Sequence, residues 1–128
     1  MELLLRNPDA GVYAATPDYA HALEVRGASR LLFVSGTMGL DAHGVAPGSL
    51  DAQLALVWDN LRAILADAAM GVDNIVRVTS YLRDAAYAEP NAAARNAALG
   101  GRLVPTTAIV VGTLARDWLV ELEVIATG

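Results

Sequence analysis

The stretch SLDAQLALVWDNLRAILADAAMGVDNIVRVTSYLRD, residues 49–84, decides the fold class because it holds the clearest helix and the clearest strand of the chain. In its first half, apolar side chains recur every three or four residues, the spacing of an amphipathic helix. These residues are Leu54, Val57, Leu61, Ile64, Leu65 and Ala68. Ser49 or Asp51 is expected to cap this helix, and Gly71 to end it as a C′ glycine. The β-branched content of residues 75–82 predicts a strand.

Two short apolar segments precede the helix. Residues 22–26 and 31–34 are separated by Gly27-Ala28-Ser29, which has the composition of a turn. We therefore expect these segments to pair as a hairpin. The stretch that follows is rich in glycine and proline and predicts a loop.

A second helix and a further strand follow the central stretch. The helix is expected from about Glu89 to Leu99, with Pro90 tolerated in its first turn and Gly100-Gly101 as its end. Residues 106–111 form an apolar run without alternation, which predicts a strand covered on both faces.

The last strand, residues 119–126, alternates in polarity, with Glu121 and Glu123 on one face. The complete order is strand, strand, helix, strand, helix, strand, strand, and it predicts a single α+β domain over residues 1–128. Right-handed crossovers place both helices on one face of one mixed sheet. The other face is then uncovered, and packing against further copies of the chain is the simplest way to bury it.

Composition agrees with an oligomer and excludes several kinds of partner. The 128 residues are 55% hydrophobic, more than a monomer of this size readily hides. No apolar run approaches the roughly 20 residues of a membrane span, and no basic region precedes the first apolar residues, so we expect a cytoplasmic protein without a membrane partner. The net charge is −5 and the nine basic residues are scattered arginines, which argues against nucleic-acid binding.

Residue types that are missing exclude some chemistry. There is no cysteine, so thiolate nucleophiles and cysteine-based zinc sites are excluded. There is no lysine, so a side-chain Schiff base is excluded as well. His21 and His43 have no partner at a metal-ligand spacing, and we expect no metal.

Several segments together resemble the RidA/YjgF family, also called the Rid family or the endoribonuclease L-PSP-like proteins. They are Ser35-Gly36, Asn60–Leu65, Ile75–Asp84, Asn91 and Val120–Ala126. The resemblance covers residues 19–126. It implies a chorismate-mutase-like ββαβαββ fold, a homotrimer around a central barrel, and three ligand clefts between subunits. It also implies cofactor-free hydrolysis of enamines and imines, such as 2-aminoacrylate, to 2-keto acids and ammonia.

The resemblance assigns roles to individual residues. Glu121 matches the glutamate that positions the attacking water. Ser35, Asn91 and Tyr19 match residues that line the cleft. Three of the four also have a purely structural reading: Glu121 as a solvated carboxylate, Ser35 as a turn hydroxyl, and Asn91 as a helix-start residue.

One family residue is missing. Members such as RidA bind the substrate carboxylate with an arginine in a Pro-Ala-Arg sequence, through a bidentate pair. Here the sequence reads Pro105-Thr106-Thr107, so Thr107 occupies the place of the arginine. A hydroxyl offers one neutral hydrogen bond, and binding of an anion should weaken by a few kcal/mol. Arg102 and Arg83 are candidates to supply the missing charge, and Thr107 is otherwise an ordinary strand residue.

Three functions remain open at this point. The first is a RidA-like hydrolase of enamines, imines or related carbonyl compounds. The second is a trimer that binds a small molecule without catalysis, which the loss of the arginine favours. The third, an endoribonuclease, is disfavoured by the negative net charge.

Overall fold

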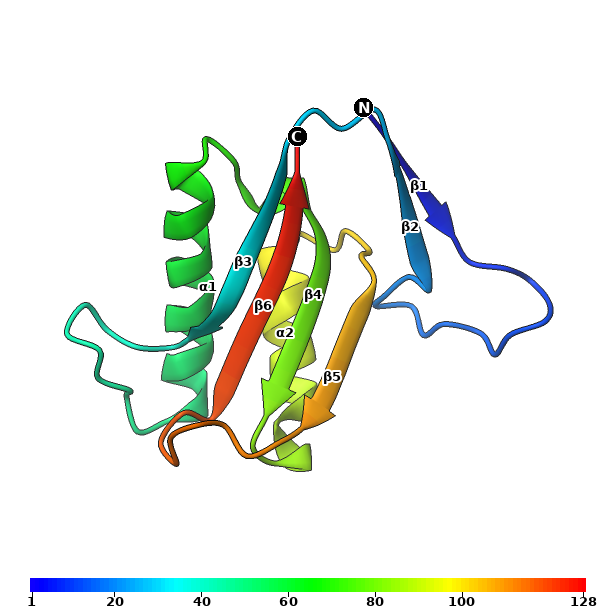
Figure 1. Ribbon diagram of the computed structural model, residues 1–128. Helices are drawn as coiled ribbons and strands as arrows, with labels where there is room; N and C mark the ends of the chain where they lie inside the picture. The colour runs from blue at the N-terminus through cyan, green and yellow to red at the C-terminus, as the bar shows by residue number, and fades with distance from the viewer.

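A four-stranded mixed sheet carries both long helices on one face, in a computed structural model that describes residues 1–128 (Figure 1). The strand order is β3-β6-β4-β5, in which β4 and β5 are parallel and β6 runs antiparallel to β3 and β4. The predicted α+β architecture, with two helices on one side of a mixed sheet, is confirmed. The elements are β1 (Glu2–Arg6), β2 (Ala22–Arg26), β3 (Leu31–Met38), α1 (Leu50–Asp67), β4 (Ile75–Leu82), α2 (Ala88–Ala98), β5 (Thr106–Val110) and β6 (Val120–Thr127).

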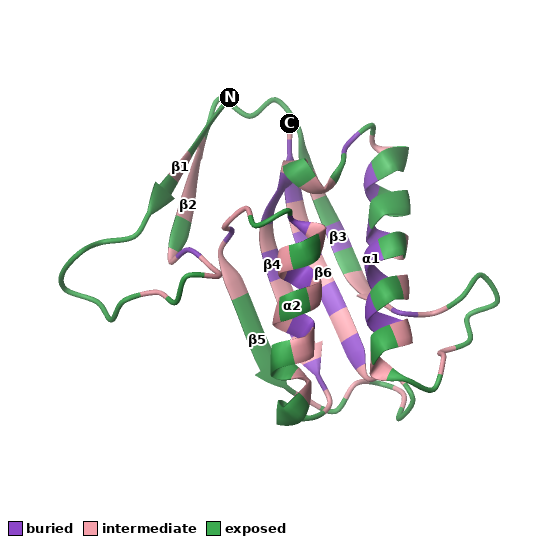
Figure 2. Cartoon of the chain, turned by 180° about the vertical axis from the view of Figure 1, so that it is seen from behind, coloured by how far each residue is buried: buried purple, intermediate pink, exposed green.

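The hydrophobic core lies between this sheet and the helices. Alternate residues of β6 point into it, so Val120, Leu122 and Val124 are almost fully buried, as predicted (Figure 2). Residues of α1 at helical spacing cover them, among them Leu61 and Leu65. The residues of β6 that lie between Val120, Leu122 and Val124, which include the two glutamates, face away from the helices.

The start of α1 was predicted correctly and its end was not. The Ser49 hydroxyl accepts a hydrogen bond from the Ala52 backbone N–H, 3.2 Å away, and caps the helix. At the other end, Ala69 takes the left-handed conformation with φ 54°, whereas Gly71 is extended. Met70 explains the difference, because its side chain joins the core and its N–H bonds to the Leu65 carbonyl. The chain must therefore turn before it reaches the glycine.

The predicted end of the second helix is confirmed. α2 stops at Ala98, and Gly100 and Gly101 follow with φ of 62° and 79°. Residues with a side chain rarely adopt such positive φ values, so the two glycines allow the chain to reverse towards β5.

The predicted hairpin of residues 22–26 and 31–34 is wrong. β2 pairs with β1, and β3 pairs with β6. The strand β1 was not anticipated, because five residues give little periodicity to detect. Its pairing places Leu3 opposite Val25, and ion pairs from Glu24 to Arg6 and Arg26 hold the ribbon. In Figure 1 this ribbon stands apart from the four-stranded sheet.

The face of the sheet opposite the helices is uncovered in the single chain. We call it the open face. It exposes large apolar side chains, with Phe33 70%, Leu31 60% and Ile109 48% accessible. The expectation that the strand at 106–111 is covered on both faces is therefore wrong for one chain, where residues 107–110 are exposed.

Close approach of β3 and α1 depends on one glycine. A Cβ added at Gly39 would lie 2.7 Å from Gln53 Cα and in still closer contact with the Gln53 carbonyl oxygen, so the backbones would have to separate. We expect Gly39→Ala to lower the free energy of unfolding by about 1–3 kcal/mol. Gly48→Ala is the control, because nothing lies within 4 Å of its added methyl. Denaturant titrations at equal protein concentration compare the two, and equal midpoints would contradict this account of the contact.

Candidate functional site

A strip of polar side chains crosses the open face of the sheet. Strand register places Glu121 beside Tyr81, and Glu123 beside Thr79. Thr79 in turn lies beside Thr107 on β5. Alternation along each strand points these side chains to the same face. Chemistry-bearing groups from three strands therefore share a surface that is otherwise apolar.

Glu121 borders a pocket of about 270 Å³ on this face. The pocket is lined by Gly36, Tyr81, Val111, Gly112, Thr113, Leu114, Glu121 and Glu123. The Glu121 side chain takes part in none of the chain's side-chain hydrogen bonds or ion pairs, although it is partly buried. Its carboxylate is therefore free to accept a hydrogen bond from a bound molecule.

Gly36 makes room for that carboxylate. The pairing of β3 with β6 is irregular between Val34 and Thr37, and Gly36 lies inside this bulge. A Cβ added at Gly36 would lie 2.9 Å from Glu121 Cδ and closer to its carboxylate oxygen. The position of the Glu121 carboxylate thus depends on the absence of a side chain on the neighbouring strand.

The second glutamate of the strip, Glu123, already accepts a hydrogen bond within the chain. The Tyr81 hydroxyl donates a hydrogen bond of 2.5 Å to Glu123 Oε1. This hydrogen bond is the main cause that raises the pKa of Tyr81 above 10.0, with desolvation and the negative charges of Glu123 and Glu121 adding to it. Glu121 and Glu123 are therefore chemically distinct, since only Glu123 is held by a donor in the chain.

We expect Glu123→Gln to bring the pKa of Tyr81 down towards its ordinary value. The glutamine lacks the negative charge that penalises phenolate formation, so Tyr81 should lose its proton at lower pH. Absorbance at 295 nm during an alkaline titration reports tyrosine ionisation, and Tyr81→Phe identifies the contribution of this residue among the four tyrosines. Identical titration curves for wild type and Glu123→Gln would contradict the assigned hydrogen bond.

Arg77 stands next to Thr107. Its Nη2 donates a hydrogen bond of 2.9 Å to Thr107 Oγ1, from the neighbouring strand β4. The two arginines suggested by the sequence are engaged elsewhere. Arg102 donates to the backbone carbonyls of Val72 and Ile75, and Arg83 binds the loop after β5 through Thr113 and Ala115.

The other predicted site residues are spread over the molecule. Ser35 is exposed next to Gly36 on the bulge and borders a hollow between β3 and α1. Tyr19 lies near the start of β5, where Ala20 bridges to Pro105, and its ring meets His21 edge-on. Asn91 is 1% exposed on α2, on the side of the sheet that the helices cover, and its Oδ1 has no hydrogen-bond partner. The structure does not bring Asn91 to the open face.

Comparison with known proteins places this arrangement in a family. The family model described as endoribonuclease L-PSP matches residues 12–128. A Rid family protein of Yersinia pestis, YyfB, described as of unknown function, has the same fold over the whole of both chains, with a TM-score of 0.85 and 25% identity. The chain belongs to the RidA/YjgF family.

Sequence relatives of this RidA/YjgF protein carry the RutC family name. One from Pyrococcus abyssi is 30% identical over 111 residues, 84% of each chain. One from Synechocystis is 32% identical over 107 residues, 77% of this chain and 79% of the relative. The solved structure of protein YjgH matches with a TM-score of 0.69 and 33% identity over 85% of this chain and 82% of the other.

Within the single chain of this RidA/YjgF protein, Thr107 and Glu121 are not neighbours. They lie two strands apart and two residues out of register, which separates their Cα atoms by about 12 Å. Thr79, Tyr81 and Glu123 lie between them, so the two residues occupy different parts of the open face of one chain.

Three residues of this surface were not anticipated from the sequence: Gly36, Tyr81 and Arg77. Their residue types alone do not indicate a functional site, because a glycine beside a serine and a strand of alternating polarity are both common. In the folded chain the bulge places Gly36 next to Glu121. Strand register brings Tyr81 close to Glu123 and Arg77 close to Thr107.

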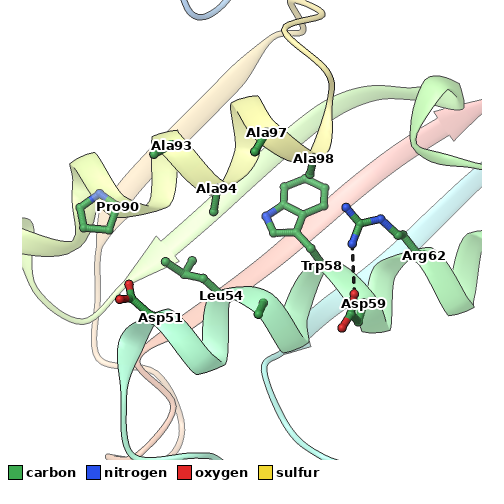
Figure 3. A pocket seen from close by; sticks show the side chains of 11 residues that line it. Asp51, Leu54, Trp58, Asp59, Arg62, Pro90, Ala93, Ala94, Ala97 and Ala98 are labelled. Carbon is green, nitrogen blue, oxygen red and sulfur yellow. Dashed lines mark hydrogen bonds and ion pairs between the residues drawn. The ribbon is translucent and has the colours of Figure 1, made fainter.

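A second hollow lies between the two helices, away from the open face (Figure 3). It holds about 530 Å³ and is lined largely by alanines of α2 together with Leu54 and Trp58. Its charged residues are Asp51, Asp59 and Arg62, of which Asp59 and Arg62 pair with each other at 3.1 Å. This groove therefore offers shape and apolar contact, and no free acid–base pair.

No group of three or more histidine, aspartate or glutamate side chains gathers where it could hold a metal ion. Neither helix has both the length and the apolar character needed to cross a bilayer.

Proposed function

We propose that this chain is a small-molecule hydrolase that acts on enamines, imines or related carbonyl compounds in clefts between the subunits of a homotrimer. The reference substrate is 2-aminoacrylate, which tautomerises to 2-iminopropanoate. Water adds to the imine carbon, the carbon–nitrogen bond breaks, and pyruvate and ammonia leave. Atoms balance without an oxidant, reductant or cofactor.

The observation that carries the proposal is the free carboxylate of Glu121 at a pocket on the open face. A carboxylate without a partner can accept a hydrogen bond from water, orient it towards the imine carbon and take up its proton. Glu123 is less suited to this role because Tyr81 already occupies one of its oxygens. Of the two glutamates in the polar strip, Glu121 is therefore the one proposed to act in catalysis.

Two features of the open face support association into a trimer. Phe33 and Leu31 expose apolar surface that association would bury. In addition, Thr107 and Glu121 lie on different parts of this face in one chain, with their Cα atoms about 12 Å apart. A cleft formed by Thr107 of one copy and Glu121 of the next would bring them together. Ser35 and Tyr19, at opposite edges of the sheet, would complete its walls.

The direct test is to generate 2-aminoacrylate in the presence of the protein and to follow pyruvate release. We expect a rate above that of spontaneous hydrolysis and proportional to protein concentration. A reaction at the spontaneous rate, at micromolar protein, would remove the hydrolase assignment.

A second candidate is a trimer that binds a small molecule without converting it. It is favoured by Thr107, which lacks the charge that members such as RidA use to hold the substrate carboxylate. Calorimetry separates the two functions. A binder gives saturable heat with pyruvate and leaves 2-aminoacrylate hydrolysis at the spontaneous rate.

Endoribonuclease activity, which the family description names, finds little support in the charges of this chain. Exposed Arg6 and Arg26 both pair with Glu24, so they form no basic patch. At a net charge of −5, we expect no RNA binding at physiological ionic strength. Fluorescence anisotropy with a labelled single-stranded RNA measures this, and binding that weakens steeply with salt would contradict it.

A further inference from the structure

Arg77 differs from most other arginines of the chain in what it contacts. Four arginines form ion pairs with carboxylates: Arg6, Arg26, Arg62 and Arg95. Three donate to backbone carbonyls: Arg30, Arg83 and Arg102. Arg77 donates only to a neutral hydroxyl, that of Thr107, and no carboxylate lies within ion-pair distance of it.

This single contact leaves most of the guanidinium unused. A guanidinium carries five N–H donors in a planar fork, and one of them serves Thr107. Arg77 borders a hollow of about 190 Å³ on the open face together with Phe33, Thr79, Glu123 and Ile125. The carboxylate of Glu123 in that hollow is bound by Tyr81. The free donors of Arg77 therefore have no internal partner of opposite charge.

Thr107 is placed to cooperate with this guanidinium. Its Oγ1 accepts the hydrogen bond from Arg77, so its own O–H remains available to donate. An anion with two oxygens can then accept from Arg77 with one and from Thr107 with the other. This geometry suits a carboxylate, which binds arginine most strongly through paired, charge-assisted hydrogen bonds.

We propose that Arg77 and Thr107 together form the binding site for the carboxylate of the substrate. The positive charge that the family carries at the Thr107 position is thus supplied from the adjacent strand, β4. The identity of the anion as a 2-keto or 2-imino acid rests on the proposed function, whereas the anion site itself rests on the contact between Arg77 and Thr107. Thr107 then holds the Arg77 guanidinium in place and contributes to specificity. Its presence in place of the family arginine does not mean that the carboxylate-binding site is lost.

Binding of pyruvate and of pyruvamide, its neutral analogue, tests this proposal by calorimetry without any turnover. We expect wild type to bind pyruvate at least tenfold more tightly than pyruvamide. Arg77→Gln should weaken pyruvate binding at least tenfold and leave pyruvamide unchanged. Arg77→Lys keeps the charge and loses the fork, so it should fall between wild type and Arg77→Gln. Thr107→Val, which removes the hydroxyl at similar volume, should weaken pyruvate binding several-fold.

Arg62→Gln is the matched control, because this exposed arginine lies on α1 away from the open face. Circular dichroism and molecular mass check that each variant folds and assembles as wild type does. If Arg77→Gln does not fold, the comparison of pyruvate with pyruvamide in wild type and Arg77→Lys still decides the matter. Equal binding of the two ligands by wild type, or pyruvate binding by Arg77→Gln within twofold of wild type, would overturn the proposal. Pyruvate binding through Arg77 without any hydrolysis of 2-aminoacrylate would instead refute the hydrolase and leave the anion site standing.

Discussion

Glu121→Gln is expected to slow pyruvate release from 2-aminoacrylate by roughly 10²–10⁴-fold, the usual contribution of a general acid–base group. The amide has nearly the same shape as the carboxylate and cannot take up a proton from water. Pyruvate binding should survive, because Glu121 is not part of the proposed carboxylate site. Initial rates and calorimetry on the same preparation measure both properties.

Two further variants sharpen this prediction. Glu89→Gln removes an exposed carboxylate from α2, on the helix side of the sheet, and should leave the rate unchanged. Gly36→Ala keeps Glu121 and displaces its carboxylate, so we expect a loss of roughly tenfold to a hundredfold. If Glu121→Gln kept the wild-type rate within threefold, the catalytic role of this residue would be refuted.

Phe33→Asp is expected to convert the proposed trimer into single chains and to abolish the proposed hydrolysis with it. Phe33 is 70% exposed on the open face, and association would bury it. A carboxylate at that position would have to be desolvated without a partner, at a cost that association cannot offset. Sedimentation velocity gives the size of the variant, and the pyruvate assay gives its activity.

The single chain should remain folded in this variant. The 16-residue core lies on the other side of the sheet, between β6 and the helices, and does not include Phe33. A wild-type far-ultraviolet spectrum is therefore expected. Val45→Asp, a change at a residue of similar exposure in the loop before α1, serves as the control and should leave the assembly intact. A Phe33→Asp protein of wild-type size and activity would show that the open face is not the interface.

The elements that the sequence predicts well are those whose pattern is local. The stripe on α1 and the alternation of β6 each follow from one segment meeting the core, and both are observed. Ile64, assigned to the same stripe, is 39% exposed, because a six-residue stripe is wider than the surface that α1 buries. The pairing of β2 with β1 could not be read in this way, because the five residues of β1 show too little periodicity to mark it as a partner strand.

In the candidate site too, some residues could be predicted from the sequence and others depend on contacts that only the folded chain shows. Position in the chain was enough to single out Glu121, Ser35 and Thr107 by resemblance. The contact of Arg77 with Thr107 was not predictable, because it needs the register between β4 and β5 and the reach of a long side chain across it. Arg102 and Arg83 looked equally suitable in sequence, and their engagement with backbone carbonyls became visible only in the folded chain.

The mass of the protein in solution tests the central claim most directly, because every proposed cleft requires more than one copy of the chain. Light scattering coupled to size exclusion, at micromolar concentration, should give three times the 13.4 kDa of one chain. A stable species of 13.4 kDa would leave the open face uncovered, with no cleft between copies of the chain, and would contradict the account.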